Sequence, residues 1–399
     1  MNIAVLAASA LLAGAANAAE FSEVATRACD GIAARVDAQP GTAAVFLRSY
    51  DAADGGEPHD AALRSAAFVY DNALAAMALL ACGKSAQAAR VGAALRIAVQ
   101  TDTRLRNAYR AGAAEKVLPN GWWDASAQRW AEDPVQSGTA TGNVAWAALA
   151  LVALGDATHD ARWGSAAQRL AGWIVDNAAD THGAGGFSGG VQGFDPAPTR
   201  LGWKSTEHNI DAAALFARLG AGERWLSQLH RADAFVAAQW DASGGRFFVG
   251  TLPDGVSENR TTSGLDAQLW PQLLEHGEAE WVRAVTYAER AHGVDGGFDF
   301  NADRDGVWVE GTAQAALVYR ALGRKAKAQR AIDLIATQFA SSGLVYATRE
   351  PRITTGLATG PGSTTADFYY YRLPHLGATA WTALAALGWN PLTGRSVLP

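Results

Sequence analysis

Runs of basic residues are absent from this 399-residue sequence, and no apolar stretch is long enough to span a bilayer. The net charge is −6 and the pI about 5.8, so the composition gives no indication of binding to nucleic acid or to an anionic membrane. Hydrophobic residues make up 49% and charged residues 18% of the chain, which is typical of a globular protein with a large core.

Cysteine is also scarce, since the chain has only Cys29 and Cys82. These two do not match the ligand pattern of a zinc site. They either form a disulfide, as in proteins of oxidising compartments, or remain two buried thiols in apolar helical surroundings. The Asp-x-Asp-Asp motif of terpene cyclases is absent, which argues against that class of helical enzyme.

Residues 1–18 are predicted to be a secretory signal peptide. The stretch from Ile3 to Ala16 is apolar, and Ala16-Asn17-Ala18 fits the small-x-small pattern of a cleavage site, although no Lys or Arg precedes it. We therefore expect residues 19–399 to be a single catalytic domain that is secreted or periplasmic.

Helical periodicity dominates the rest of the chain, and it comes in pairs. Segments that are apolar all round predict buried helices, and the amphipathic segments between them predict outer helices. Because the spacing is too uneven for a solenoid, we predict an all-α fold, an (α/α)6 toroid or barrel of six inner and six outer helices. The inner helices are expected at about 68–82, 141–155, 206–219, 263–276, 309–322 and 375–388, and the outer helices at about 20–37, 85–100, 160–178, 223–240, 278–291 and 325–340.

The loops before the predicted inner helices are long and place glycine next to aromatic residues, at 120–124, 185–187, 244–248 and 296–300. Long structured loops in a compact domain are usually functional. We expect these segments to form short β-pieces on the rim where the inner helices begin, with short links on the other rim.

Carboxylates recur in the first turns of the predicted inner helices, where parallel packing would bring them around one cavity. Hydrolysis of a glycosidic bond needs one carboxyl group that donates a proton and a second that stays ionised. Glu310 is the first candidate for the general acid, because Trp308 and its apolar neighbours would raise its pKa. Glu207 and Asp71 complete the predicted catalytic set. The alternative is that all three are ordinary helix-start carboxylates.

A second group of residues is predicted to bind carbohydrate. Aromatic rings in glycine-rich loops suit stacking on sugar faces, and polar side chains near the helix starts suit hydrogen bonds to hydroxyl groups. The predicted contacts are Trp123, Asp124, Trp203, Lys204, His208, Asn209, Asp266, Trp308, Tyr370 and His375. Trp146 and Trp381 lie within apolar helices and are predicted to be core residues.

No metal or cofactor is expected. The segment Asn301–Gly306 offers alternating oxygen ligands before a glycine, as calcium loops do, but it lacks the downstream bidentate glutamate. We therefore interpret it as a polar turn.

The paired helices, the glycine-aromatic segments and the helix starts at Tyr70–Leu74, Ser205–Asn209 and Trp308–Ala313 resemble the six-hairpin glycosidase superfamily over nearly the whole mature chain. The resemblance implies an (α/α)6 barrel that hydrolyses O-glycosyl bonds of an oligo- or polysaccharide, usually with inversion and without a cofactor. It carries over no catalytic pair, because the acid and base differ among its families. A monomer is expected.

Three alternatives stay open. A polysaccharide lyase would need a Tyr or His base and a group that neutralises a uronate, such as His208 or Arg260, but the acidic rim favours a neutral glycan. A sugar epimerase would need two catalytic histidines, for which His208 and His375 are available. A non-catalytic glycan-binding or scaffold protein would keep the aromatic residues without needing the carboxylates.

Overall fold

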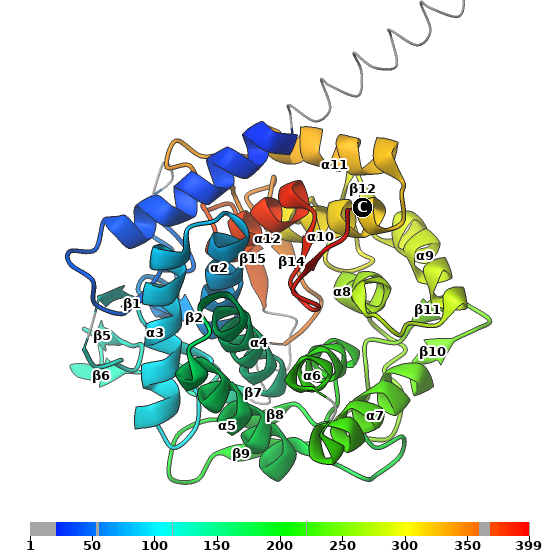
Figure 1. Cartoon of the computed structure of the whole chain (residues 1–399), viewed down its shortest axis with the longest axis horizontal. Helices are drawn as coiled ribbons and strands as arrows, with labels where there is room; N and C mark the ends of the chain where they lie inside the picture. The colour runs from blue at the N-terminus through cyan, green and yellow to red at the C-terminus, as the bar shows by residue number, and fades with distance from the viewer. Residues whose placement is uncertain (1–20, 53–55, 114, 221, 359–367, 399) are drawn as a thin grey trace, which may run out of the picture.

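The computed structural model describes residues 21–52, 56–113, 115–220, 222–358 and 368–398. The predicted signal peptide lies outside these residues. Within them, twelve α-helices alternate along the chain between an inner and an outer group (Figure 1). The inner helices are α2 (Val69–Ala81), α4 (Thr141–Thr158), α6 (Thr206–Leu219), α8 (Leu265–Leu269), α10 (Val309–Ala321) and α12 (Leu376–Leu387). The outer helices are residues 21–37, α3 (Ser85–Thr101), α5 (Ala161–Ala178), α7 (Glu223–Ala238), α9 (Arg283–Ala291) and α11 (Lys325–Ala336).

Burial separates the two groups as the sequence predicts. Helix α4 is apolar around almost its whole circumference and is buried from Val144 to Val152, whereas α5 buries only one stripe. The inner helices pack in chain order, α2 against α4, α4 against α6, and onward through α8 and α10 to α12, which contacts α2. Helices α3, α5, α7, α9 and α11 each pack against the inner helix before them. None of the described helices is long and apolar enough to cross a membrane.

The fourth inner helix is shorter than predicted. The α-helix ends at Leu269 and continues as a 3-10 turn over Trp270–Leu273. Pro271 explains this, because it has no N–H to donate to the preceding turn. Another 3-10 turn, Ala279–Val282, replaces the expected start of α9.

Short antiparallel strand pairs occupy the loops, as predicted. All but the last described pair lie in segments that lead from an outer helix to the next inner helix. The pairs are β1 (Val45–Phe46) with β4 (Gly112–Ala113), β2 (Ala66–Phe68) with β3 (Ala108–Arg110), β5 (Trp122–Asp124) with β6 (Arg129–Ala131), β10 (Trp240–Asp241) with β11 (Arg246–Phe247), β12 (Gly293–Val294) with β13 (Gly297–Phe298), β14 (Arg352–Thr354) with β15 (Tyr369–Tyr371), and β16 (Trp389–Asn390) with β17 (Arg395–Ser396). Strands β7 (Thr139–Ala140), β8 (Gly190–Gln192) and β9 (Thr199–Leu201) form one three-stranded sheet.

Buried polar side chains fix these loops to the inner helices. The fourth residue of five inner helices binds the backbone of a preceding loop: Asn72 binds Leu47, Asn209 binds Phe187, Gln268 binds Phe247, Thr312 binds Phe298 and Thr379 binds Val345. Buried backbone groups must find such partners. The loops are thereby held at the ends where the inner helices begin.

Cys29 and Cys82 form a disulfide, which joins the helix over residues 21–37 to the end of α2. Of the two possibilities that the sequence left open, the structure shows the bridge.

Candidate active site

Equivalent positions of the six inner helices form two layers of side chains. The second residues form one layer, and the residues four further on form another, because a spacing of four places side chains on the same helix face. The first layer is Tyr70, Gly142, Glu207, Asp266, Glu310 and Gly377, and the second is Leu74, Trp146, Asp211, Trp270, Gln314 and Trp381.

Glu310 belongs to the first layer, and its side chain is 1% exposed. Its Oε1 accepts a hydrogen bond from the Tyr70 hydroxyl at 2.8 Å, and that hydroxyl accepts one from Trp381 Nε1 at 2.8 Å. Its Oε2 has no hydrogen-bond partner. Burial raises the pKa of Glu310 to about 7, with a further contribution from the Asp71 carboxylate.

Asp71 and Glu310 flank the imidazole of His375. Nε2 of His375 lies 3.5 Å from Asp71 Oδ2, and Nδ1 lies 3.7 Å from Glu310 Oε2. Burial alone would lower the pKa of His375, but the two carboxylates outweigh it and the pKa is raised. The ring also accepts a hydrogen bond from the Ala378 N–H, so the same side chain caps α12.

Glu207, Asp211 and Asp266 form the opposite side of the cluster. Burial raises the pKa of Glu207 to about 7. Burial, and then the neighbouring carboxylates, raise the pKa of Asp211 and Asp266 well above their usual values. Both oxygens of Asp211 and Oδ1 of Asp266 have no hydrogen-bond partner. Burial lowers the pKa of the adjacent His208 to about 4, so this imidazole is neutral near pH 7.

Two glycines leave room between these groups. A Cβ on Gly377 would lie 2.5 Å from Asp71 Oδ1 and 2.9 Å from Glu310 Oε2. A Cβ on Gly142 would lie 2.5 Å from His208 Cδ2 and 3.0 Å from Asp211 Oδ2. All four distances are below normal contact, so the first layer depends on glycine at these helix starts.

Two predicted binding residues border the cluster. The Trp203 ring lies 5.5 Å from that of His208, and the Tyr370 ring lies 6.1 Å from that of His375. Trp308 is 1% exposed, and its ring centroid lies 5.3 Å from that of Tyr370. It therefore supports the Tyr370 ring from the core side.

Lys204 and Asn209 do not face the carboxylates. The buried ammonium of Lys204 donates to the His182 carbonyl at 2.7 Å and lies 3.3 Å from Asp180. Asn209 is fully buried and uses its amide on the backbone of Phe187 and Ser205. Both side chains therefore hold the loop in front of α6.

Trp123 and Asp124 lie on the β5–β6 hairpin of the loop between α3 and α4. Trp123 is 58% exposed, and it pairs directly across the hairpin with Trp130. Asp124 Oδ1 accepts bonds from Ser126 and Ala127 within the turn.

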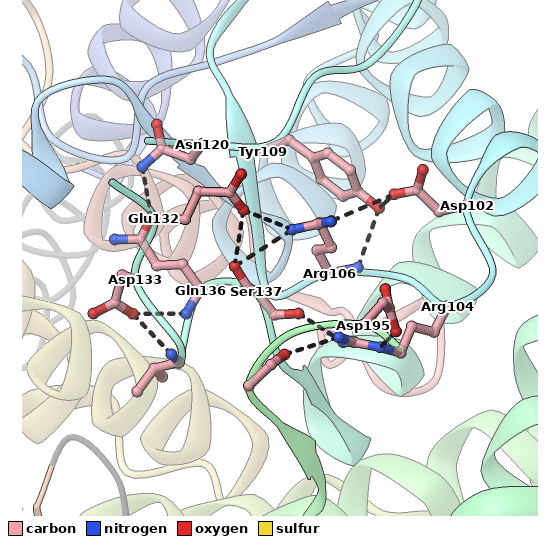
Figure 2. Close-up of polar contacts among 12 residues, drawn as sticks. Asp102, Arg104, Arg106, Tyr109, Asn120, Glu132, Asp133, Gln136, Ser137 and Asp195 are labelled. Atoms are coloured by element: carbon pink, nitrogen blue, oxygen red, sulfur yellow. Dashed lines mark hydrogen bonds and ion pairs between the residues drawn. The ribbon is translucent and has the colours of Figure 1, made fainter. Parts of the chain in front are cut away.

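Figure 2 shows the polar network at the base of this loop. Asn120 donates to Gln136 at 2.6 Å, Arg106 binds Glu132 at 3.2 Å, and the buried Arg104 binds Asp195 at 3.0 Å. The residues on either side of the hairpin are therefore held in place by hydrogen bonds and ion pairs.

Sequence reasoning assigned no site role to Tyr70, Gly377 and Gln314, and it placed Trp146 and Trp381 only in the core. Tyr70 and Gly377 share with the acids the second position of an inner helix, and the other three lie four residues after that position, so these two positions are the signal that could have found them. Trp146, Trp270 and Trp381 contact one another with ring centroids 5.4–5.9 Å apart, so they line the second layer as well as filling the core.

In the segment that resembles a calcium loop, Asn301 Oδ1 accepts a hydrogen bond from Asp303 N and Asp303 Oδ1 accepts one from Asp305 N. Asp299, Asp303 and Asp305 have oxygen atoms within 4.8 Å of one another. Among the described residues this is the one group of carboxylates or histidines compact enough for a metal ion. Thr354 and Asn301 already donate to Asp303, so the turn is bonded within the protein itself.

Comparisons with known proteins show which solved structures share this fold. No protein-family model and no curated protein sequence matches the chain. A solved wild-type glycosidase matches with a TM-score of 0.61 at 14% identity, over 95% of this chain and 99% of its own. A sugar epimerase from a ruminal bacterium matches with a TM-score of 0.62 at 12% identity, over 92% of this chain and 98% of its own. A GH76 α-mannanase from Bacteroides thetaiotaomicron matches with a TM-score of 0.56 at 11% identity, over 91% of this chain and 95% of its own. At these identities the similarity shows a shared fold.

Proposed function

We propose that this protein is a secreted or periplasmic glycoside hydrolase, a single (α/α)6-barrel domain that acts on an oligo- or polysaccharide as a monomer. The observation that carries the proposal is the pair Glu207 and Glu310, which lie at the same position of α6 and α10 and both have a pKa raised to about 7. Two carboxyl groups that titrate near neutral pH suit acid and base roles. The contact of α12 with α2 supports the barrel, and the disulfide supports an oxidising compartment.

Glu310 is the general acid in this proposal. Burial keeps it protonated, Tyr70 orients Oε1, and the unpartnered Oε2 is free to meet the glycosidic oxygen. Glu207 is half-buried and activates water as the base. Asp71 acts through His375, which it holds beside Glu310, and Asp266, His208, Trp203 and Tyr370 contact the sugar.

Inversion is favoured by the position of α8 between α6 and α10. Neighbouring helices pack about 8–10 Å apart, so acids on alternate helices have a wider gap than acids on adjacent ones. A gap of roughly 6.5–9.5 Å between the carboxyl groups admits the attacking water, whereas a retaining enzyme needs about 5–5.5 Å.

The decisive experiment is a screen of the protein on neutral and acidic glycans, following reducing ends together with the ultraviolet absorbance of unsaturated uronates. We expect reducing ends without absorbance, and a loss of about 10²–10⁴-fold in kcat for Glu310→Gln and Glu207→Gln. Glu223→Gln, on the exposed start of α7, is the matched control. NMR of the first-formed anomer tests inversion. Reducing ends that persist unchanged in both site variants would reject these catalytic roles.

Sugar epimerisation is the second candidate, because His208 and His375 lie on opposite sides of the carboxylate cluster. An epimerase would incorporate solvent deuterium into a free sugar, whereas a hydrolase would not. A lyase is disfavoured, because Arg260, which could neutralise a uronate, is exposed and forms an ion pair with Glu258. A glycan-binding protein without catalysis would retain its glycan in Glu310→Gln and release no reducing ends.

A further inference from the structure

The second layer of the site contains a carboxylate to which the proposed hydrolysis assigns no role. Asp211 is fully buried, one helical turn below Glu207, and neither of its oxygens has a hydrogen-bond partner. Gln314, also fully buried, approaches Asp266, and the N–H group of Trp146 approaches Asp211, but neither contact has the geometry of a full hydrogen bond. Buried acceptors without partners cost free energy, so the oxygens of Asp211 and Oδ1 of Asp266 point to a ligand that donates hydrogen bonds to them.

Burial and mutual repulsion raise the pKa of the acids in this cluster, so they ionise fully only beside a compensating positive charge. Asp211 interacts with the carboxylates of Glu207 and Asp266, and Asp266 interacts with Glu310. Among the described residues no Lys or Arg forms an ion pair with any of these four acids. His375 sits on the side of Asp71 and Glu310, and the buried ammonium of Lys204 is held by Asp180. A ligand with positive charge would therefore be stabilised here.

A metal ion does not fit this arrangement. The four acids come from three helices, and they are not among the carboxylate groups whose oxygens approach within 4.8 Å of one another. Aromatic rings are close instead, since the Trp146 and Trp270 rings are 5.4 Å apart and Trp146 lies beside Asp211. Indole faces attract organic cations. An ammonium group can donate three hydrogen bonds in different directions, which suits acceptors that lie on separate helices.

We propose that the site recognises an amino sugar, whose ammonium group is received by Asp211 and Asp266 beside the indoles of Trp146 and Trp270. This inference rests on the proposed glycosidase site and names its substrate class, a glycan that contains unacetylated amino sugars. Acetylation would remove the charge and add bulk in a layer that is already packed by three tryptophans.

Calorimetric titration tests the proposal with D-glucosamine and D-galactosamine against D-glucose, D-galactose and the two N-acetyl sugars. Phosphate buffer is used, because Tris is itself a hydroxylated ammonium. We expect at least one amino sugar to bind about tenfold or more tightly than its neutral and N-acetylated counterparts. Asp211→Asn, which keeps the shape and removes the charge, should reduce that ratio to about twofold. Asp176→Asn, on the outer helix α5, is the matched control and should keep the full ratio.

Binding of neutral and amino sugars with equal affinity would overturn the proposal, and so would a preference that persists in Asp211→Asn. Should Asp211→Asn fail to fold, the comparison of sugars on the unaltered protein decides alone. Hydrolysis of neutral glycans with no amino-sugar preference would reject this inference and leave the proposed function standing. Amino-sugar binding with no hydrolysis of any glycan, including partly deacetylated polymers, would reject the hydrolase instead.

Discussion

The hydroxyl group of Tyr70 lies 2.8 Å from Glu310 Oε1, although the two residues are 240 positions apart in the chain. The same hydroxyl accepts the indole N–H of Trp381, so three inner helices meet at one oxygen atom. The Tyr70 bond opposes the effect of burial and lowers the pKa of Glu310. Tyr70 thereby holds the proposed acid in place and limits the rise in its pKa.

Tyr70→Phe removes both hydrogen bonds. Because the pKa of Glu310 should then rise further, the basic limb of the pH–rate profile should move to higher pH, since a general acid must be protonated. We expect kcat to fall about tenfold, the equivalent of one hydrogen bond of roughly 1.4 kcal/mol. A basic limb that stays in place would show that Glu310 does not act as the acid.

Gly377→Ala should reduce activity about 100-fold or more, because the added methyl would collide with Asp71 and Glu310 and displace His375. Gly164→Ala is the matched control, since it lies in helix α5 with no atom within 4 Å of the added Cβ. It should keep full activity and gain about 0.5–1 kcal/mol of stability. The measurements are kcat and the midpoint of urea unfolding, and equal activity in both variants would contradict the proposed crowding.

Glu310→Gln should change how stability depends on pH. The pKa of Glu310 is raised in the folded state from 4.5 to about 7, so this group stabilises the fold at low pH and the stabilisation is lost as pH rises through about 7. Glutamine does not ionise, so the variant does not lose stability in this way as the pH rises. The variant should match the parent near pH 4 and exceed it by up to about 3 kcal/mol at pH 8. Urea unfolding at both pH values provides the measurement, and a constant difference across pH would argue that Glu310 ionises normally.

Asn209→Ala tests whether this amide supports the loop or binds sugar. The substitution leaves the N–H and C=O of Phe187 without their partner, so we expect a loss of roughly 2–4 kcal/mol in the free energy of unfolding. Asn72→Ala should cost a similar amount, because Asn72 binds Leu47 in the same way. An increase in KM with unchanged stability would instead assign Asn209 to the substrate.

Replacing Cys29 and Cys82 with alanine opens a cross-link between residues 53 positions apart. The unfolded chain gains entropy, and the free energy of unfolding should fall by about 4 kcal/mol. Activity at low temperature should persist, because Cys82 follows the end of α2 whereas Tyr70 and Asp71 lie at its start. Loss of activity in a variant that remains folded would contradict this separation.

Much of the helical layout could be predicted from local pattern. Apolar segments of about 15 residues and amphipathic partners locate ten of the twelve described helices closely, since burial of one stripe or of the whole circumference leaves a period in the sequence. The exceptions are α8, where Pro271 ends the helix early, and α9, whose expected start is a 3-10 turn. The cysteine pairing could not be decided, because two residues 53 apart give no local signal of contact.

The acids Glu207, Asp266 and Glu310 could be proposed from the sequence because each lies in the first turn of an inner helix. Lys204 could not be placed in the same way, since its partner Asp180 lies in another loop and only the packing of the two loops makes their ion pair. Gly377 and Tyr70 were missed for a similar reason, because their importance comes from residues that lie on other helices.

The sequence by itself determines that the chain forms alternating buried and amphipathic helices, and that carboxylates stand at the starts of the buried ones, because hydrophobic period and helix-start position are local properties. Only the tertiary structure decides which side chains converge, which of them are bonded elsewhere, and which carboxyl groups have a raised pKa. These depend on burial and on distances between helices that are hundreds of residues apart, and no single segment encodes them.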